Sequence, residues 1–288
     1  MKILEVKDLN KIYPSFRLNN VSFTLEEGSI MGFIGRNGAG KTTTLKAIMN
    51  LIHKNSGEVK IEGKDFIENE NVLKGNIGFL LAEHDYYTKK KIKIISNVTK
   101  RFYKDWDDDK YHYYLKFFNI DENKAIKDLS NGMKVKYQLA IALSHNAKLL
   151  ILDEPTSGLD PISRDEILEI FKKIVKDKKH AILFSTHITS DLDKCADAIT
   201  YIHNGSIVAS ETKNDFLETY LLVSGSENDL NDKLKNHFIS YRIEDGKFAG
   251  MIKKLEYEED DKLTTKLPNI EEIMIYTERS KEDEEFII

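Results

Sequence analysis

The sequence has a single cysteine and no long apolar run, and each absence narrows the class of protein. Cys195 is the only cysteine among 288 residues, so no disulfide can form within the chain and a reducing cytoplasm is the expected compartment. No stretch approaches the roughly 18 consecutive apolar residues that a membrane-spanning helix needs. The opening residues, Met-Lys-Ile-Leu-Glu-Val-Lys, lack the apolar core of a secretory signal. We therefore expect a chain with neither a membrane span nor a signal of its own.

The charge pattern also lacks an evident basic stripe or arginine-rich segment, which argues against nucleic acid as the main partner. Residues 224–288 contain 17 Asp and Glu against 10 Lys and Arg, a balance of −7 in a chain whose net charge is −5. The first 223 residues therefore carry about +2. This change of charge, together with a linker-like Ser224-Gly225-Ser226, predicts a main domain at residues 1–222 and a small acidic extension at residues 223–288.

A glycine-rich segment is the strongest motif, since it follows an apolar run at residues 29–34 and precedes a helix-like segment at residues 42–50. Its spacing, G-x-x-x-x-G-K-T, is that of a phosphate-binding loop. Glycine lets the backbone curl so that successive N–H groups point at one anion, and the following helix presents its positive end to the same phosphates. The lysine adds a full charge, and the threonine hydroxyl can reach Mg²⁺. The predicted nucleotide-binding residues are Gly35, Arg36, Asn37, Gly38, Ala39, Gly40, Lys41, Thr42 and Thr43.

Two acids, Asp153 and Glu154, follow the apolar run at residues 148–152. Such a run is typical of a strand buried on both faces of a parallel sheet, and ligands bind beyond the carboxyl ends of such strands. Asp153 could hold Mg²⁺ through water, and Glu154 could polarise the water that attacks a γ-phosphate. By itself, an Asp-Glu pair would indicate only the solvent-exposed end of a strand. In a chain with a phosphate loop, the catalytic hypothesis is favoured.

A second potential anion site lies at Ser130 and Gly132, directly before a helix predicted at residues 134–144. A serine hydroxyl and the free N–H groups of a helix start can both donate to an anion. Two anion sites far apart in one chain suggest that both bind the same nucleotide, from opposite sides. In addition, Tyr13, in a turn between two predicted strands, could stack on an adenine.

Taken in order, these motifs resemble those of the ATP-binding-cassette (ABC) ATPase subunits of transporters. The resemblance covers about residues 1–222 and rests on the phosphate loop, a signature sequence at residues 129–133 (Leu-Ser-Asn-Gly-Met), a Walker B strand at residues 149–154, a D-loop at residues 157–160 (Ser-Gly-Leu-Asp) and a switch histidine, His187. It implies an α/β P-loop NTPase fold with a parallel core sheet, an antiparallel β subdomain and an inserted helical subdomain at about residues 88–145. Residues 223–288 would add a small α+β extension.

The resemblance also implies roles for individual residues. Two such subunits sandwich two ATP molecules, so that Ser130, Asn131, Gly132 and Asp160 would contact ATP held by the partner subunit. Glu154 would be the general base, and His187 would contact the γ-phosphate.

The expected cofactors are ATP and Mg²⁺, and the metal would be held by Thr42, Asp153 and Glu83. The family usually has a glutamine near Glu83; this sequence reads Ala82-Glu83, and either residue can take that place.

The resemblance finally implies partners and a location. We expect a membrane-spanning permease and a second ABC ATPase, identical or a paralogue, at the cytoplasmic face of the membrane. The Ser-Gly-Leu-Asp form and the added acidic region resemble bacterial exporters of antibiotics, antimicrobial peptides or phenol-soluble modulins. An importer ATPase is one alternative. Another is a soluble ABC ATPase acting on ribosomes or DNA, which the single cassette and the absence of sustained heptads at residues 42–129 disfavour.

Overall fold

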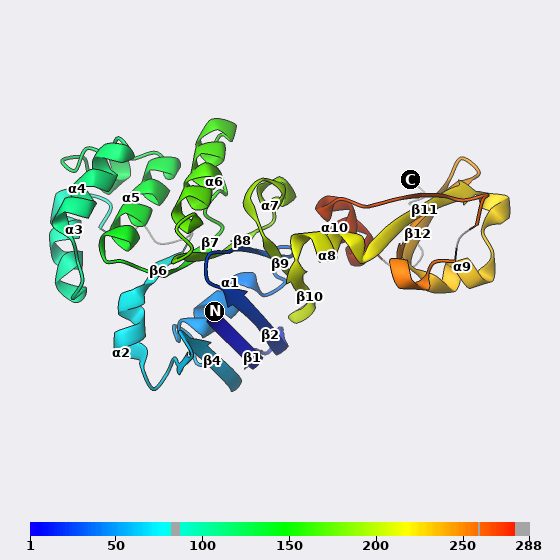
Figure 1. Ribbon diagram of the computed structural model, residues 1–288, viewed down its shortest axis with the longest axis horizontal. Coiled ribbons are helices and arrows are strands. Elements are labelled where there is room, and N and C mark those ends of the chain that lie inside the picture. Colours follow the sequence, from blue (N-terminus) through cyan, green and yellow to red (C-terminus); the bar gives the residue numbers. More distant parts are fainter. Residues whose placement is uncertain (82–86, 259, 280–288) are drawn as a thin grey trace. The chain divides into compact units, whose positions relative to one another are not determined.

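The computed structural model describes residues 1–81, 87–258 and 260–279, and its contacts divide the chain into two compact units (Figure 1). The first unit is Met1–Ser210 and the second is Glu211–Ile288. The sequence pattern places a boundary after residue 222, later than the observed division. The physical reason is that strand β11 (Tyr220–Ser226) pairs along its whole length with strand β13 (Lys247–Lys253), so this segment packs within the second unit.

A six-stranded sheet forms the centre of the first unit. Its strands, in spatial order, are β10 (Ser206–Thr212), β9 (Ala198–His203), β3 (Ile30–Ile34), β8 (Ala181–Thr186), β7 (Leu149–Asp153) and β6 (Ile77–Leu80). Strands β9 through β6 pair in parallel, and β3, β7 and β8 are buried at every residue, as their continuous apolar runs predict. Their carboxyl ends therefore meet at one edge of the sheet, where the predicted site residues follow.

An antiparallel sheet packs on the same core. Its strands, in spatial order, are β2 (Arg17–Glu26), β1 (Lys2–Ile12), β4 (Ser56–Ile61) and β5 (Lys64–Asp65). Phe23 of β2 stacks on Phe33 of the central sheet, with 5.5 Å between ring centroids. Helix α1 (Lys41–Ile48) contributes Leu45 and Ile48 to the same buried cluster. The phosphate loop, which joins β3 to α1, is therefore anchored at both of its ends.

Helices complete the first unit, and none in the described part of the chain is long and apolar enough to cross a membrane. They are α2 (Glu70–Leu73), α3 (Ile92–Thr99), α4 (Asp108–Phe117), α5 (Asn131–Ser144), α6 (Pro161–Val175) and α7 (Thr189–Cys195), with 3₁₀ turns η1 (Lys74–Asn76), η2 (Lys100–Phe102) and η3 (Ile126–Asp128). Helices α3, α4 and α5 form a group between β6 and β7 in sequence (Figure 1).

Buried hydroxyl groups join the three helices of this group. The Ser96 hydroxyl of α3 lies 2.9 Å from the Tyr137 hydroxyl of α5 and accepts a hydrogen bond of 2.7 Å from the Tyr111 hydroxyl of α4. Burial raises the pKa of Tyr137 to about 12, so that its hydroxyl stays protonated.

The predicted α/β class, with its parallel core sheet, antiparallel sheet and inserted helices, is confirmed.

The second unit is a separate α+β arrangement. It comprises α8 (Lys213–Glu218), β11, η4 (Glu227–Asp229), α9 (Asp232–His237), β12 (Phe238–Glu244), β13, η5 (Lys254–Glu256), β14 (Thr264–Lys266) and α10 (Ile270–Glu278). The spatial order of its antiparallel sheet is β12-β13-β11-β14. Val223, Phe238, Phe248 and Ile252 form its buried cluster with Tyr241. Its own core explains why this segment separates from the first unit.

Gly205 provides a test of how the two sheets of the first unit are joined. It has a φ of +77°, and a Cβ there would lie 1.9 Å from the carbonyl oxygen of Arg17 in β2. We expect Gly205→Ala to lower the free energy of unfolding by at least about 2 kcal/mol, measured by urea titration. Gly63→Ala is the control, because Gly63 has a φ of +73° and no atom near the added carbon; it should cost only about 1 kcal/mol. Equal losses would contradict the steric explanation.

Candidate active site

The phosphate loop is shaped by close contacts that leave no room for side chains at two of its glycines. A Cβ on Gly35 would lie 2.4 Å from the carbonyl oxygen of Ile202, and one on Gly40 would lie 2.7 Å from a methyl group of Leu18. Gly40 is the N-cap of α1 with a φ of 114°, and no side chain caps the helix. The N–H groups at this helix terminus are therefore available to an anion.

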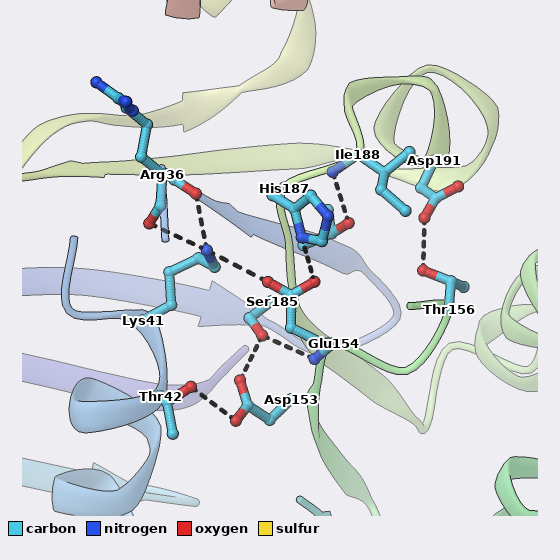
Figure 2. A network of polar contacts seen from close by, with 12 residues as sticks. Arg36, Lys41, Thr42, Asp153, Glu154, Thr156, Ser185, His187, Ile188 and Asp191 are labelled. Carbon is cyan, nitrogen blue, oxygen red and sulfur yellow. Dashed lines mark hydrogen bonds and ion pairs between the residues drawn. The ribbon is translucent and has the colours of Figure 1, made fainter. Parts of the chain in front are cut away.

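Lys41 lies inside this loop and is almost fully buried. Its Nζ donates hydrogen bonds to the carbonyl oxygens of Gly35, at 2.7 Å, and Arg36, at 3.3 Å, and forms an ion pair of 3.3 Å with Glu154 Oε1 (Figure 2). The ammonium group is thus placed in the curl of the backbone, between two carbonyl oxygens and the carboxylate of Glu154, the residue predicted from the sequence to be the general base.

Asp153 connects the loop to two strands. Thr42 Oγ1 donates to Asp153 Oδ2 at 2.8 Å, and Ser185 Oγ donates to Asp153 Oδ1 at 2.7 Å. Ser185 Oγ also accepts a hydrogen bond of 2.9 Å from the backbone N–H of Glu154 (Figure 2). Helix α1 and strands β7 and β8 are therefore tied together through one buried carboxylate.

The donor set around Asp153 fits a magnesium ion bound together with a phosphate. A hydroxyl and a carboxylate are oxygen ligands of the kind that Mg²⁺ prefers, and Mg²⁺ is commonly held by one or two carboxylates plus substrate phosphates. Across residues 1–81, 87–258 and 260–279 no cluster of three or more His, Cys, Asp and Glu side chains could hold a metal alone. A metal at Thr42 and Asp153 would therefore take its other ligands from nucleotide, from water or from residues outside these ranges, where the predicted ligand Glu83 lies.

Glu154 adopts a backbone conformation that is uncommon for a side chain larger than glycine. Its φ is +49°, and such conformations occur preferentially at functional sites. Its Oε2 lies 2.8 Å from Nδ1 of His187, which follows β8 and is more exposed than Glu154 (Figure 2). A mostly buried carboxylate held by a solvent-facing imidazole is the geometry of a base with an orienting partner.

A second network, which the sequence analysis missed, lies behind this pair. The hydroxyl of Thr156 donates to Asp191 Oδ2 at 2.6 Å, and Nε of Arg164 donates to the other oxygen of the same carboxylate. Asp191 is completely buried. The network joins the segment after Glu154 to the segment after His187, so it helps to hold those two side chains in a fixed relative position.

These additional residues carried little signal in the sequence. Ser185 and Thr156 are common hydroxyl residues outside any motif, and Asp191 reads as an ordinary acid in the first turn of a helix. The one available signal was position: Thr156 lies two residues after Glu154, and Asp191 lies four residues after His187.

The signature residues lie at the start of α5. Ser130 is the N-cap, and its Oγ accepts a hydrogen bond of 3.2 Å from the backbone N–H of Met133. Gly132 is buried, and a Cβ there would lie 3.2 Å from Ser163 Cβ. No contact recorded among the described residues joins Ser130, Asn131 or Gly132 to the phosphate loop. Within one chain, the structure thus does not bring the two predicted anion sites together.

Asp160 has a comparable position at the start of α6. It is the N-cap, and its carboxylate accepts hydrogen bonds of 3.0 Å from the backbone N–H groups of Ile162 and Ser163. Hydrogen bonds from Ser163, and then from Ile162, hold the pKa of Asp160 below its ordinary value. Asp160 therefore stays ionised and fixes the turn between β7 and α6.

The remaining predicted residues lie at the edges of this arrangement. The ring of Tyr13 faces Lys11 Nζ, 4.9 Å from its centroid. Phe16, in the same turn, lies beside the phosphate loop, since its Cζ would be 2.8 Å from a Cβ on Gly40. Phe16 is thus an aromatic candidate that the sequence analysis did not select. Ala82 and Glu83 fall outside the described residues.

These features define a P-loop nucleoside triphosphatase. Strand β3, a glycine loop and helix α1 follow one another, with Lys41 where the loop meets the helix. Thr42 donates to Asp153 at the end of β7, and Glu154 follows Asp153 directly. The comparisons with known proteins identify its family. The family described as ABC transporter matches residues 18–157.

Curated relatives agree with this family. YtrB, an ABC transporter ATP-binding protein of Bacillus subtilis, is 27% identical over 95% of this chain and 97% of its own. The bacitracin transport ATP-binding protein BcrA of Bacillus licheniformis is 32% identical over 72% of this chain and 68% of its own. The lantibiotic transport ATP-binding protein SrtF of Streptococcus pyogenes is 34% identical over 72% of this chain and 89% of its own.

A solved structure described as the ATP-binding subunit of an ABC transporter is similar to about three quarters of this chain. It has 28% sequence identity and a TM-score of 0.66, and the match covers 74% of this chain and 91% of that one. The chain therefore belongs to the ABC transporter family. It is an ATP-binding subunit of that family, whose ATPases hydrolyse ATP to power transport.

The Asp191 network generates a stability prediction. Asp191→Ala leaves the largely buried Arg164 side chain without its carboxylate, and we expect the free energy of unfolding to fall by about 3 kcal/mol in urea titration. The control is Asp165→Ala, because the Asp165–Lys194 pair is half exposed on both sides and should contribute less than about 1 kcal/mol. A loss at Asp191 no larger than at Asp165 would show that the network does not stabilise the site.

Proposed function

We propose that this subunit powers export through a membrane permease by nucleotide-driven pairing of two ATPase subunits at the cytoplasmic face of the membrane. The observation that supports it most is the continuous network in Figure 2, from Lys41 and Thr42 through Asp153 and Glu154 to His187. The names of BcrA and SrtF, for bacitracin and lantibiotic transport, support a cargo of antibiotics or antimicrobial peptides.

In this proposal, the residues from Gly35 to Thr43 hold the triphosphate of ATP. The backbone N–H groups of the loop and the uncapped start of α1 donate to the phosphate oxygens. Lys41 exchanges the carbonyl oxygens of Gly35 and Arg36, and the carboxylate of Glu154, for phosphate oxygens. Because Lys41 then no longer neutralises Glu154, binding of the triphosphate also frees the base.

Thr42 and Asp153 are the proposed ligands of Mg²⁺. The bound ion would supply positive charge to the phosphate oxygens. The two residues are already adjacent, and Ser185 holds the second oxygen of Asp153 in place. Glu83 is a third candidate ligand from the sequence.

Glu154 is the proposed general base. Its carboxylate accepts the proton of the attacking water, and His187 holds its other oxygen at 2.8 Å. A base that is fixed before the reaction loses less rotational freedom at the moment of proton transfer. His187 is also exposed enough to contact the γ-phosphate.

Ser130, Asn131, Gly132 and Asp160 are proposed to act on the ATP of the partner subunit. Ser130, Asn131 and Gly132 lie at a helix start that has no hydrogen bond to the phosphate loop among the described residues of its own chain, so a second ATPase subunit, a copy or a paralogue, would complete the site. In a two-fold arrangement the same patches meet reciprocally.

Replacement of the base tests the catalytic assignment. Glu154→Gln should retain MgATP binding and slow hydrolysis by roughly 10²–10⁴-fold, because an amide cannot accept the proton. Hydrolysis is measured as phosphate release from the purified protein, and binding by titration with a fluorescent ATP analogue. Glu169→Gln, on the exposed side of α6, is the matched control and should not change turnover. Unaltered hydrolysis in Glu154→Gln would remove Glu154 from the mechanism.

Replacing the signature serine, Ser130, with arginine tests the proposed pairing of two ATPase subunits. In the Glu154→Gln background, the intact complex with its membrane partner should trap MgATP that resists exchange. Ser130→Arg should abolish most of this trapped nucleotide without weakening the initial binding to the phosphate loop. The control, Ser56→Arg, alters an exposed serine of β4 and should trap nucleotide normally. Normal trapping by Ser130→Arg would exclude the signature sequence from the shared site.

A further inference from the structure

Asp191 holds two parts of the chain that are distant in sequence. Its side chain is completely buried and lies in the first turn of α7. Its Oδ2 accepts the hydrogen bond of 2.6 Å from the Thr156 hydroxyl, and its Oδ1 accepts from Nε of Arg164 in α6. Arg164 also donates to the Ser190 hydroxyl at 2.6 Å. One fixed carboxylate therefore holds both the turn that follows Glu154 and helix α6.

The stability that this network adds is a weak explanation for its presence. A buried carboxylate and a partly buried guanidinium both lose water, and well-packed apolar groups in the place of such a pair are often equally stable or more so. An arginine offers its donors in a rigid planar arrangement, so the pair is strongly directional. The network thus defines the positions of the segments that it joins more than it adds to their stability.

The segment that Thr156 anchors begins with the proposed base. The backbone N–H of Ser157 donates to the carbonyl oxygen of Glu154 at 3.1 Å, so residues 154–157 form one turn. In this turn Glu154 has a φ of +49°, and a residue with a Cβ keeps such a conformation only where its surroundings define it. Thr156 provides this constraint two residues further on, because its hydroxyl is bound to Asp191 (Figure 2).

Asp191 also belongs to the segment that carries His187, whose Nδ1 lies 2.8 Å from Glu154 Oε2. Within this segment the backbone N–H of Ile188 donates to the Thr186 hydroxyl at 2.9 Å, and that of Asp191 donates to the Ile188 carbonyl oxygen at 3.2 Å. Hydrogen bonds therefore hold the short path from His187 to Asp191. The Asp191 carboxylate links this path to the turn that carries the base.

We propose that Asp191 is a positioning residue for ATP hydrolysis, which acts through Thr156 to hold the Glu154 carboxylate where it can accept the proton of the attacking water. Without the Thr156 hydroxyl, the turn relaxes toward an ordinary backbone conformation and the carboxylate moves away from His187. This inference rests on the proposed role of Glu154 as the general base. A displacement of about 1 Å can slow a reaction by about a hundredfold, so a buried carboxylate outside the reaction itself controls turnover.

Thr156→Val tests the proposal, since valine keeps the shape of the side chain and removes its hydroxyl. We expect kcat to fall roughly tenfold to a hundredfold, measured as phosphate release from the purified full-length protein at saturating MgATP. The dissociation constant of a fluorescent ATP analogue should stay unchanged, because the phosphate loop is intact. Thr156→Ser, which restores a hydroxyl, should recover most of the turnover.

Thr200→Val is the matched control. Thr200 lies in β9, is completely buried, and has its hydroxyl 2.9 Å from that of Ser210. This variant therefore also loses a buried hydroxyl of the first unit, but in a strand that carries none of the proposed site residues. It should keep the turnover of the parent. All variants are assayed below the temperature at which their unfolding begins.

Double variants distinguish positioning from a general structural role. In the Glu154→Gln background the base is already absent, so adding Thr156→Val should slow the residual hydrolysis by less than about twofold. A purely structural role would slow it by the same factor as in the parent. Asp191→Ala should slow turnover at least as much as Thr156→Val does, and combining these two changes should slow it no further, because the same hydrogen bond is lost in each.

Four outcomes would overturn the proposal. They are parent-like turnover in Thr156→Val, an equal loss in Thr200→Val, an equal factor in the parent and Glu154→Gln backgrounds, and losses that multiply when Asp191→Ala and Thr156→Val are combined. Failure of the proposed function would appear separately, as unaltered hydrolysis in Glu154→Gln itself.

Discussion

The arrangement of the site depends on one buried carboxylate, that of Asp153. Two hydroxyl groups, from Thr42 and Ser185, each donate to one of its oxygens. A buried charge deprived of such partners costs several kcal/mol, so the start of α1 and the ends of β7 and β8 are held in a fixed mutual position. The group that is proposed to bind a metal ion is therefore also the group that aligns the phosphate loop with the base.

The next residue, Glu154, is the proposed base, and its position depends on the same alignment. Glu154 occupies a left-handed backbone conformation, which costs of the order of 1 kcal/mol or more for a residue with a Cβ. Its N–H donates to Ser185, its two carboxylate oxygens meet Lys41 and His187, and the chain beyond it is fixed by Thr156 through Asp191. The strain persists because contacts on every side define this conformation.

The sequence predicted the parts of the site that are local in the chain. The residues from Gly35 to Thr42 form one contiguous motif, and Asp153 and Glu154 end an apolar run, so their positions follow from the parallel-sheet rule alone. Ser185 and Asp191 could not be found in this way, because their roles arise from strand neighbours and helix packing brought together only by the fold. Similarly, choosing between Tyr13 and Phe16 requires knowing which ring the turn places beside the loop.

The second unit shows the same limit at a larger scale. The change of charge after residue 223 is real, yet chain segments divide by pairing rather than by charge, and β11 lies on the far side of the division because its partners, β13 and β14, come later in sequence. A charge average over a long segment does not depend on which strands pair, so it placed the boundary later than the contacts divide the chain.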